Sequence, residues 1–345
     1  MYSETVNKVI SGFGLDSDKA DLTPLAGGLI NDTYSLALGD AHYVLQRINA
    51  SVFPDPYALI HNADLITHYL DGTDYPLEPL RQKKAIDGKS YVVHHGVWRI
   101  TDRIQNSFAL QQAKNTQQAA QVANAFGCFS RYLHGFDANS LSEVLEDFHI
   151  LPRRLLQLEQ AALKDSHKRR LACEPELSWL QEQDSLVKSF AQAIADMPAR
   201  VCHNDTKINN MLLSNETQQA IAVIDWDTCM PGRLMFDFGD MVRSACAVEG
   251  TTGDMGISEP FFEVMSDAYL SEMKSVITPD EIDSLWLGCL GISLNLGVRF
   301  LTDFLDGDRY FAATTPLQNL ERAQTQFAIY RALQRQEKRL IAYLK

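Results

Sequence analysis

The sequence lacks any pair of cysteines separated by two residues, and its six cysteines are widely scattered. No group of cysteine and histidine residues has the ligand spacing of a zinc site. This pattern argues against a zinc module and against a disulfide framework. We instead expect buried or free thiols in a reducing cytosol.

Positive charge is also in short supply. The chain has 31 Lys and Arg against 44 Asp and Glu, for a formal net charge of -13 and a pI of about 5.1. A nucleic-acid binder needs a basic stripe that displaces counterions from phosphates, so we expect no nucleic-acid partner. The overall field would repel a polyanionic ligand, which would therefore need local cations or a metal ion.

Signals for export and membrane insertion are missing as well. The first ten residues, MYSETVNKVI, do not combine a basic region with an apolar run, which disfavours a signal peptide. We expect no stretch of the length that spans a bilayer, and hence a soluble, cytoplasmic protein without a membrane partner. The sequence makes no prediction about the oligomeric state.

What the chain does contain is enough apolar sequence for a large core. Its 345 residues are 46% hydrophobic, which suits two domains or one bilobal domain. Up to about residue 104, short apolar runs alternate with turn signals, which predicts an antiparallel sheet with one inserted helix at 55–70. The expected strands cover residues 21–25, 33–38, 43–48, 83–86, 90–94 and 97–104.

From residue 105 onward, the helical spacing of apolar residues dominates. The expected helices cover residues 115–134, 151–163, 177–194, 260–273, 279–305 and 317–344. Residues 200–240 interrupt them with short strands and loops. We therefore predict an α+β fold with a small antiparallel-sheet N-terminal lobe, residues 1–104, and a larger helical C-terminal lobe, residues 105–345.

Between the helices, residues 201–213 carry a pattern of chemical side chains, H-x-D-x-K-x-x-N. An apolar strand at 220–224 then leads into a further aspartate. Phosphoryl transfer needs a carboxylate for the proton of the attacking hydroxyl, a cation near the γ-phosphate, and an amide oxygen and a second carboxylate for magnesium. The residues of the pattern are His203, Asp205, Lys207, Asn210 and Asp225.

This pattern resembles the protein-kinase superfamily, in particular its aminoglycoside-phosphotransferase branch. The resemblance implies a bilobal protein-kinase-like fold that uses ATP and Mg²⁺, with nucleotide in the N-terminal lobe and the catalytic loop and acceptor site in the C-terminal lobe. It implies that Asp205 is the catalytic base and that Lys207 stabilises the γ-phosphate. Asn210 and Asp225 would be the magnesium ligands, and Asp227 is a candidate for a second contact.

Two further residues are expected to be structural. We expect His203 to hold the catalytic loop rather than to take part in chemistry. Asp237, in the sequence FDFGD at 236–240, resembles the buried aspartate of the family. We expect it to accept backbone N–H bonds from the catalytic loop and so to hold Asp205 in place.

The N-terminal lobe carries a glycine-rich turn. Gly27 and Gly28 would let backbone N–H groups approach phosphates, although a plain hairpin is the alternative. The turn does not follow the pattern G-x-x-x-x-G-K-[ST], which disfavours a P-loop fold. Asn31 and Asp32 are an unusual polar pair for such a loop, and we expect them to reach the acceptor substrate.

The strand that follows should carry a cation for the nucleotide phosphates. Alternation leaves either Gln46 or Arg47 facing the cleft, and we favour Arg47. The next helix lacks a clean match for the glutamate that normally pairs with this cation, because the stretch reads His61, Asn62 and Asp64. The backbone of the expected hinge, from Thr101 to Ile104, should bond adenine.

Longer stretches resemble the N-acetylhexosamine 1-kinase group, which phosphorylates the anomeric hydroxyl of GlcNAc or GalNAc. They include GGLINDT at 27–33, YVLQRIN at 43–49, HNDTKINN at 203–210 and VRFLTDFLDGDRYF at 298–311. The resemblance implies an amino sugar as the small-molecule substrate, contacted by Arg299 and Tyr310. Arg299 could instead pair with Asp303, four residues on, and Tyr310 could be a packed loop aromatic.

Two other functions stay open. A kinase for another hydroxyl acceptor, such as an aminoglycoside, choline, homoserine or muramic acid, would use the same catalytic residues. A nucleotide-binding pseudokinase that acts as a scaffold or sensor is compatible with the atypical cation of the N-terminal lobe. ATP consumption with a panel of acceptors separates these functions.

Overall fold

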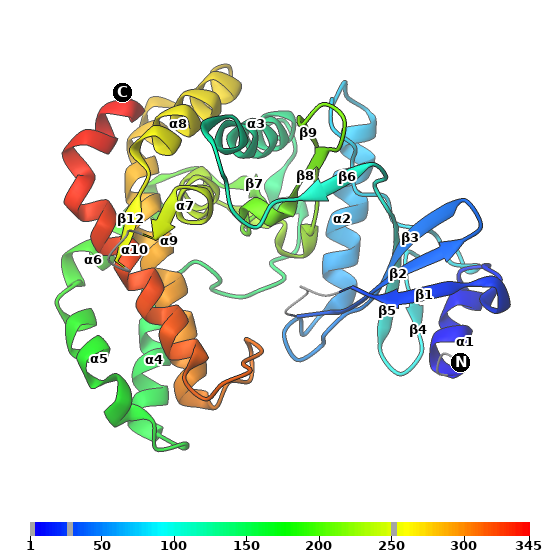
Figure 1. The fold of residues 1–345 in the computed structure, drawn as a ribbon, viewed down its shortest axis with the longest axis horizontal. Helices are drawn as coiled ribbons and strands as arrows, with labels where there is room; N and C mark the ends of the chain where they lie inside the picture. The colour runs from blue at the N-terminus through cyan, green and yellow to red at the C-terminus, as the bar shows by residue number, and fades with distance from the viewer. Residues whose placement is uncertain (1–3, 26–29, 250–253) are drawn as a thin grey trace.

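The computed structural model describes residues 4–25, 30–249 and 254–345. It has two lobes, an antiparallel sheet with its helices at the N-terminal end of the chain and a mostly helical part at the C-terminal end (Figure 1). The predicted α+β fold class is confirmed. Gly27 and Gly28 lie outside the described residues.

The N-terminal sheet has five strands in the order β1-β2-β3-β5-β4. Their bounds are β1 (Asp21–Pro24), β2 (Asp32–Leu38), β3 (Ala41–Arg47), β4 (Val92–Val93) and β5 (Val97–Asp102). Alternate side chains point to opposite faces, and one face buries Leu36, Leu45 and Ile100. Helix α1 (Glu4–Gly12) covers that face with Val9 and Ile10, which leaves the other face for the rest of the molecule.

Helix α2 (Pro56–Asp71) lies between the sheet and the C-terminal lobe (Figure 1). Asp55 caps it by accepting the N–H bonds of the first helical turn. The buried Asn62 donates hydrogen bonds to the carbonyl groups of Ser142 and Cys229, at 2.8 and 3.0 Å. Although α2 belongs to the N-terminal part of the sequence, its apolar side chains join the main core of the C-terminal lobe. These are Ala63, Ile66 and Leu70.

Eight helices of the C-terminal lobe follow within the described residues. They are α3 (Thr116–Tyr132), α4 (Leu151–Lys164), α5 (Glu174–Gln181), α6 (Asp184–Asp196), α7 (Leu234–Ala245), α8 (Glu259–Met273), α9 (Pro279–Asp306) and α10 (Gln318–Leu340). Short strands hold the segments between them. β6 (Ser107–Ala109), β8 (Met211–Ser214) and β9 (Ala220–Val223) form one sheet, β7 (Arg200–Cys202) pairs with β10 (Met230–Gly232), and β11 (Ala247–Glu249) pairs with β12 (Met255–Ile257).

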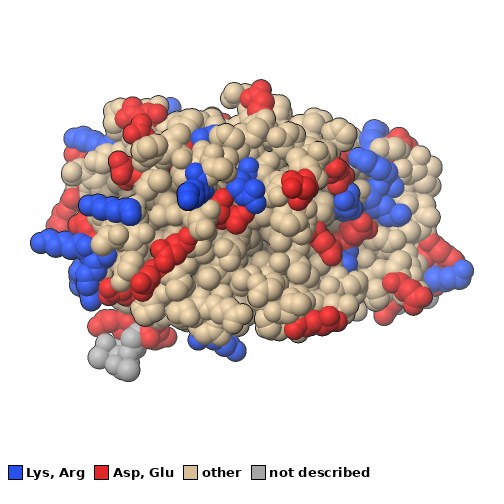
Figure 2. All heavy atoms as spheres, turned by 90° about the horizontal axis from the view of Figure 1, so that it is seen from above, with Lys and Arg blue, Asp and Glu red and all other residues tan. Residues whose placement is uncertain are grey.

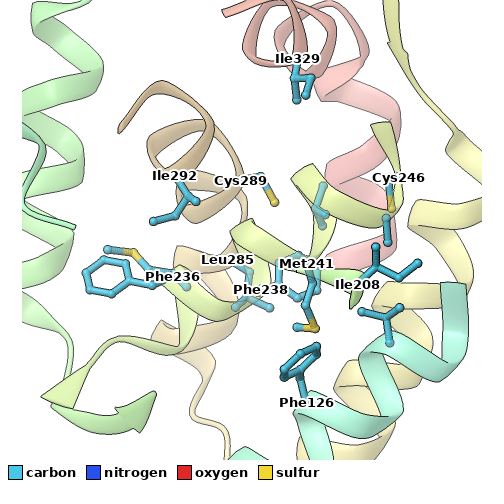
Figure 3. Close-up of a cluster of buried hydrophobic side chains, with 14 of the residues drawn as sticks. Phe126, Ile208, Phe236, Phe238, Met241, Cys246, Leu285, Cys289, Ile292 and Ile329 are labelled. Atoms are coloured by element: carbon cyan, nitrogen blue, oxygen red, sulfur yellow. The ribbon is translucent and has the colours of Figure 1, made fainter. Parts of the chain in front are cut away.

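Helix α7 is the centre of the large hydrophobic cluster (Figure 3). It crosses α9 where Gly239 faces Gly288, and a Cβ atom at either glycine would collide with the backbone of the other helix. Ile208, which directly follows Lys207, joins the same cluster. This packing anchors the loop that carries the candidate catalytic residues.

Three elements differ from the sequence prediction. Residues 83–86 form an irregular segment rather than a strand, and the expected helix at 177–194 is divided into α5 and α6. Helix α7 was not predicted. Every residue from Leu234 to Val242 is buried, and the polar side of the helix faces the interior, where Asp237 accepts N–H bonds of the catalytic loop and Asp240 pairs with Arg243. The prediction depended on polar residues that face solvent, which this helix does not have over that stretch.

The expectation that no stretch could span a bilayer needs correction. Helix α9 has 28 residues and a mean hydropathy of 1.4 over its most apolar window, which is long and apolar enough. However, 72% of that window is buried inside the protein. Core helices of globular proteins pass the same test, so α9 is weak support for a membrane span.

Charged side chains of both signs are interspersed on the face that Figure 2 shows. Lys and Arg form no broad area among the described residues of this face. This mixed distribution on one face agrees with the net charge of -13.

Candidate active site

The candidate catalytic loop, residues 203–210, connects β7 to β8. It ends in a 3₁₀ turn, Ile208–Asn210, directly before β8. β8 pairs with β9, and Asp225 follows the end of β9 with a φ of 64°, a left-handed conformation that aspartate tolerates. The pairing brings the loop and Asp225 together.

Lys207 lies between the two candidate carboxylates. Its Nζ atom is 2.6 Å from Oδ2 of Asp205 and 3.8 Å from Oδ2 of Asp225. The side-chain nitrogen of Asn210 donates to the backbone carbonyl and to Oδ2 of Asp205, at 2.8 and 3.1 Å. The structure therefore brings together the four residues that the sequence predicts for phosphoryl transfer.

The charges of this group are mutually dependent. Burial acts to raise the pKa of Asp205, but the charge and hydrogen bond of Lys207 outweigh it and hold this pKa below its ordinary value. Burial opposes the charged form of Lys207, yet Asp205 and Asp225 raise its pKa. Burial, followed by the negative charges of Asp227 and Asp205, raises the pKa of Asp225 to about 6 against the opposing effect of Lys207. A cation beside Asp225 would relieve this repulsion.

The oxygen donors of the site suit Mg²⁺. Asn210 uses its amide nitrogen for Asp205, which leaves its amide oxygen for a cation beside Asp225. Across residues 4–25, 30–249 and 254–345, no cluster of three or more His, Cys, Asp or Glu side chains could enclose a metal ion. Mg²⁺ does not need such a cage, since it usually binds through one or two carboxylates together with substrate phosphates and water.

His203 and Asp237 hold the loop from the core side. Nε2 of His203 lies 2.9 Å from the carbonyl oxygen of Ile224, and Nδ1 lies 3.3 Å from the donating N–H of Asp205. Both contacts fit a neutral ring with its proton on Nε2, and burial lowers the pKa of His203 to about 4. Asp237 accepts the N–H bonds of His203 and Asn204 at 2.9 and 2.7 Å, and these are the contacts that the sequence predicts for it.

Two residues of the loop environment escaped the sequence analysis. Asn204 has a φ of 62°, and its side chain donates to the carbonyl groups of Cys202 and Thr228 at 3.1 and 3.0 Å. Nε2 of the buried His149 lies 3.1 Å from the carbonyl oxygen of Asn204. The signal for Asn204 was its residue type, because asparagine favours the left-handed conformation at turns. His149 lies on a distant segment and gave no signal.

The predicted phosphate cation, Arg47, does not face the C-terminal lobe. It is exposed, donates a 2.8 Å hydrogen bond to the carbonyl of His95, and lies on the face of the sheet that α1 covers. Its neighbour Gln46 lies on the opposite face, directly across from Arg99 of β5. Nε and Nη2 of Arg99 donate to Oε1 of Gln46 at 2.9 and 2.7 Å, and Nη2 forms an ion pair with Asp227. The prediction for Arg47 was wrong because alternation alone could not decide between the two faces.

The polar pair of the glycine-rich turn is divided between two environments. The side chain of Asn31 donates to Oδ2 of Asp227 at 2.7 Å and accepts the N–H of Asn49 at 3.0 Å. Asp32 is exposed and lies beside Arg47 at 3.7 Å, on the other face of the sheet. The structure therefore brings Asn31 to the candidate site and not Asp32.

The predicted hinge, from Thr101 to Ile104, connects β5 to β6. β6 pairs with β8, so the chain changes from one lobe to the other within this segment. Thr101 is buried, and the N–H groups of Asp102 and Arg103 already bond carbonyl groups of the N-terminal lobe at 3.0 and 3.1 Å. A contact between this backbone and adenine stays a prediction. It would have to use the backbone groups of residues 101–104 that are not already bonded.

A cavity of about 510 Å³ lies between the lobes, and none of residues 203–210 lines it. Its wall includes Phe148, whose neighbour His149 contacts the carbonyl of Asn204 in the loop. Both residues predicted to contact the acceptor, Arg299 and Tyr310, line the cavity. Further lining residues come from both lobes and include Val52, Pro54 and Arg154.

Arg299 does not form the alternative ion pair with Asp303. The carboxylate of Asp303 instead accepts the backbone N–H bonds of residues 309–311, at 2.8, 2.8 and 2.9 Å. The guanidinium of Arg299 lies over the ring of Phe148 at 4.3 Å and donates a 3.2 Å hydrogen bond to the hydroxyl of Tyr310. Asp303 thus shapes the loop that brings Tyr310 to the cavity.

Together, the bilobal fold and the Asp205–Lys207–Asn210–Asp225 group define a kinase-like phosphotransferase. A profile of the phosphotransferase enzyme family matches residues 21–273, and the chain belongs to this family.

Solved structures with the same fold include three phosphotransferases of small molecules. The aminoglycoside phosphotransferase of Alicyclobacillus acidocaldarius is 16% identical, with a TM-score of 0.61 over 97% of this chain and 96% of that one. The ethanolamine kinase of Plasmodium vivax is 13% identical, with a TM-score of 0.61 over 93% and 85%. A spectinomycin phosphotransferase, solved with ADP and spectinomycin, is 12% identical, with a TM-score of 0.53 over 94% and 92%. At these identities the likeness shows the fold.

Proposed function

We propose that this protein transfers the γ-phosphate of ATP to the anomeric hydroxyl of an N-acetylhexosamine, in a reaction that depends on Mg²⁺. The observation that carries the proposal is the position of Lys207 between Asp205 and Asp225. A cavity between the lobes, which these residues do not line, contains Arg299 and Tyr310. Phosphoryl transfer needs positioning and charge stabilisation more than covalent chemistry, and these groups supply both.

Each residue has a separate task in this proposal. Asp205 accepts the proton of the attacking hydroxyl, and Lys207 stabilises the charge that develops on the transferred phosphoryl group. Asn210 and Asp225 would hold Mg²⁺, and the bound ion would neutralise charge on the phosphate groups. Asp237 and His203 keep the loop in the conformation that presents Asp205.

The lowered pKa of Asp205 is compatible with an acceptor that has an acidic hydroxyl. Because the charge of Lys207 outweighs burial, Asp205 is a weak base near neutral pH. The anomeric hydroxyl of a sugar is more acidic than an ordinary alcohol, so a weak base suffices. An aspartate of ordinary pKa is also a weak base at this pH, so this match is compatible with a sugar 1-kinase without discriminating against other hydroxyl acceptors.

The charges in the cavity do not by themselves select between a neutral and a cationic acceptor, because five carboxylates line it together with two guanidinium groups. Two guanidinium groups, Arg154 and Arg299, enter it, and burial together with the charge of Arg299 lowers the pKa of Arg154 to about 10. Three lining carboxylates already serve the backbone, since Asp55 caps α2, Glu143 accepts the N–H of Asp147, and Asp303 binds residues 309–311. Glu146 and Asp306 also line the cavity, so a cationic acceptor such as choline or an aminoglycoside stays an alternative to the sugar.

A phosphorylation screen tests the proposal. ATP consumption is measured with GlcNAc, GalNAc, glucose, galactose, choline, homoserine, muramic acid and an aminoglycoside, and NMR of the product locates the phosphate. We expect turnover with an N-acetylhexosamine, phosphate on the anomeric oxygen, and loss of turnover in the Asp205→Asn variant. Preferred turnover of choline or an aminoglycoside would replace the acceptor assignment. Nucleotide binding without turnover of any acceptor would favour a pseudokinase.

A further inference from the structure

We infer that Arg99 of β5 is the phosphate-binding cation of the N-terminal lobe, and that Asp227 of the C-terminal lobe holds it in position. The inference rests on the proposed use of ATP. It places on β5 the phosphate-binding cation that was expected on β3. It places after β9 the carboxylate that was expected on the helix following β3.

Arg99 is almost completely enclosed at the junction of the two lobes. Its side chain is 2% exposed and that of Asp227 is 4% exposed, although the two belong to different lobes. Gln46 fixes the guanidinium from the neighbouring strand through two hydrogen bonds to Oε1, and Gln46 is in turn held by Thr33 through a 3.2 Å hydrogen bond. Asn31 fixes the other oxygen of Asp227 at 2.7 Å. The guanidinium plane is therefore set from two sides.

One nitrogen of this guanidinium is left without an acceptor. Nη1 of Arg99 is buried and has no hydrogen-bond partner among the described residues. A guanidinium carries five N–H donors in a fixed fork, and buried donors are nearly always satisfied. Two donors held in a fixed plane, beside the loop that carries Asp225, fit the oxygens of a phosphate group.

Each other Lys and Arg in the described part of the N-terminal lobe contacts a group within that lobe. Arg47 bonds His95 on the α1 face, and Lys84 pairs with Asp64 at 2.8 Å. The others contact nearby side chains: Lys8 with Glu4, Lys19 with Asp16, Arg81 with Asp71, Lys83 with Tyr43, Lys89 with Asp87 and Arg103 with Ser35. Arg99 is the cation that contacts the C-terminal lobe.

The residues of α2 that could have held a cation are engaged elsewhere. Asn62 bonds Ser142 and Cys229, and Asp64 bonds Lys84, Ser90 and Gln82. Asp227 supplies the missing carboxylate instead.

The position of Asp227 links Arg99, the inferred phosphate cation, to Asp225, the candidate metal ligand. Asp227 stands two residues after Asp225, in the turn Trp226–Thr228. The ion pair of Arg99 with Asp227 therefore couples the position of the N-terminal sheet to that of Asp225.

Equilibrium binding of Mg–ADP and of a non-hydrolysable ATP analogue, measured by calorimetry, tests the inference without requiring turnover. We expect Arg99→Gln to weaken binding by about 10- to 100-fold, the usual size of a hydrogen bond to a charged group. Arg99→Lys should lose part of the affinity because it keeps the charge but not the fork. Arg47→Gln is the matched control on the adjacent strand and should bind as the wild type does.

A double variant separates phosphate binding from stability. Arg99→Gln leaves Asp227 buried without its cation, so it is compared with Arg99→Gln/Asp227→Asn, which removes both charges. The double variant should recover the thermal stability lost by Arg99→Gln but not the nucleotide affinity. Wild-type affinity in a folded Arg99 variant would overturn the inference alone. Failure of the wild-type protein to bind either nucleotide would overturn the proposed function and the inference with it.

Discussion

The carboxylate of Asp237 accepts a 2.7 Å hydrogen bond from the backbone N–H of Asn204, which connects the central helix of the C-terminal lobe to the residue before Asp205. The same carboxylate accepts the N–H of His203 at 2.9 Å. Burial raises the pKa of Asp237 to about 7, in spite of the lowering effect of both hydrogen bonds. The position of Asp205 therefore depends on a buried group that does not touch the reacting atoms.

Replacement of Asp237 by alanine should impair both the fold and the reaction. Two buried N–H groups would lose their acceptor, at a cost of about 2 to 5 kcal/mol of unfolding free energy. We also expect kcat to fall while the KM for ATP changes little, because the loop would lose its fixed conformation. Urea denaturation and steady-state kinetics measure the two effects. Asp267→Asn, at an exposed position of α8, is the control, and equal stability of the two variants would contradict the argument.

The local part of the site was predictable from the sequence because its geometry is encoded over a few residues. The spacing of Asp205, Lys207 and Asn210 fits one tight loop, and Asp225 directly follows a short apolar strand. Strand pairing then needs no further information to bring the two segments together. The contact of Asp237 was predictable only through the resemblance to a family, since it joins segments separated by three strands.

Contacts between distant segments were not predictable in this way. The ion pair of Arg99 with Asp227 depends on which face of β3 and β5 meets the C-terminal lobe, and alternation leaves both faces possible. The spacing of Arg299 and Asp303 is that of a helical ion pair, but the loop after Gly307 folds back and its backbone N–H groups take the carboxylate. In both cases tertiary contacts decide between two locally acceptable partners.

Two conservative substitutions should separate proton acceptance from metal binding. Asp205→Asn keeps the shape of the side chain, so we expect Mg–ADP to bind as in the wild type while transfer falls by at least about 10²-fold. Asp225→Asn removes a charge from the metal site and should weaken the Mg²⁺-dependent part of nucleotide binding. Calorimetry with and without Mg²⁺ and single-turnover assays measure these effects. Near-wild-type turnover of either variant would show that the roles are wrongly assigned.

Lys207→Ala should lower kcat more than it lowers nucleotide affinity. The charge that Lys207 would stabilise develops mainly in the transition state, so its loss affects the chemical step. The variant also removes the cation that lies 2.6 Å from Asp205 and 3.8 Å from Asp225, which should leave the two carboxylates repelling each other. Comparison of kcat with the dissociation constant of Mg–ADP measures the difference. An unchanged kcat would exclude Lys207 from the reaction.

Arg299 should affect the acceptor and not the nucleotide. We expect Arg299→Gln to raise the KM for the sugar by about tenfold, the value of one charged hydrogen bond, with little change in the KM for ATP. Arg309→Gln is a matched control because Arg309 is exposed and its backbone N–H, which contacts Asp303, is retained. Initial rates at varied sugar and ATP concentrations measure both constants. A change in the KM for ATP alone would place Arg299 outside the acceptor site.

The buried His149 should make the free energy of unfolding fall as the pH falls below neutral. Substitution of His149 should reveal this dependence. The ring is buried, with Nε2 3.1 Å from the carbonyl oxygen of Asn204 and Nδ1 3.2 Å from the side-chain nitrogen of Asn295. Burial, followed by the charge of Arg299, lowers the pKa of His149 to about 3. In the unfolded chain the ring titrates near its ordinary pKa of 6.5. Between these two values the unfolded state binds more protons, so stability decreases as the pH falls.

The opposite shifts of Asp225 and Asp237 partly offset this loss, because their raised pKa values stabilise the folded state as the pH falls toward 4. We therefore compare variants instead of the wild type at two pH values. His149→Gln should be destabilising at pH 7.5, and the difference from the wild type should shrink by roughly 2 kcal/mol at pH 5, because only the wild type loses the contribution of a buried neutral histidine. Urea denaturation at both pH values measures the difference, and His61→Gln, on the exposed face of α2, is the control. A difference that stays constant with pH would show that His149 can take up a proton in the folded protein.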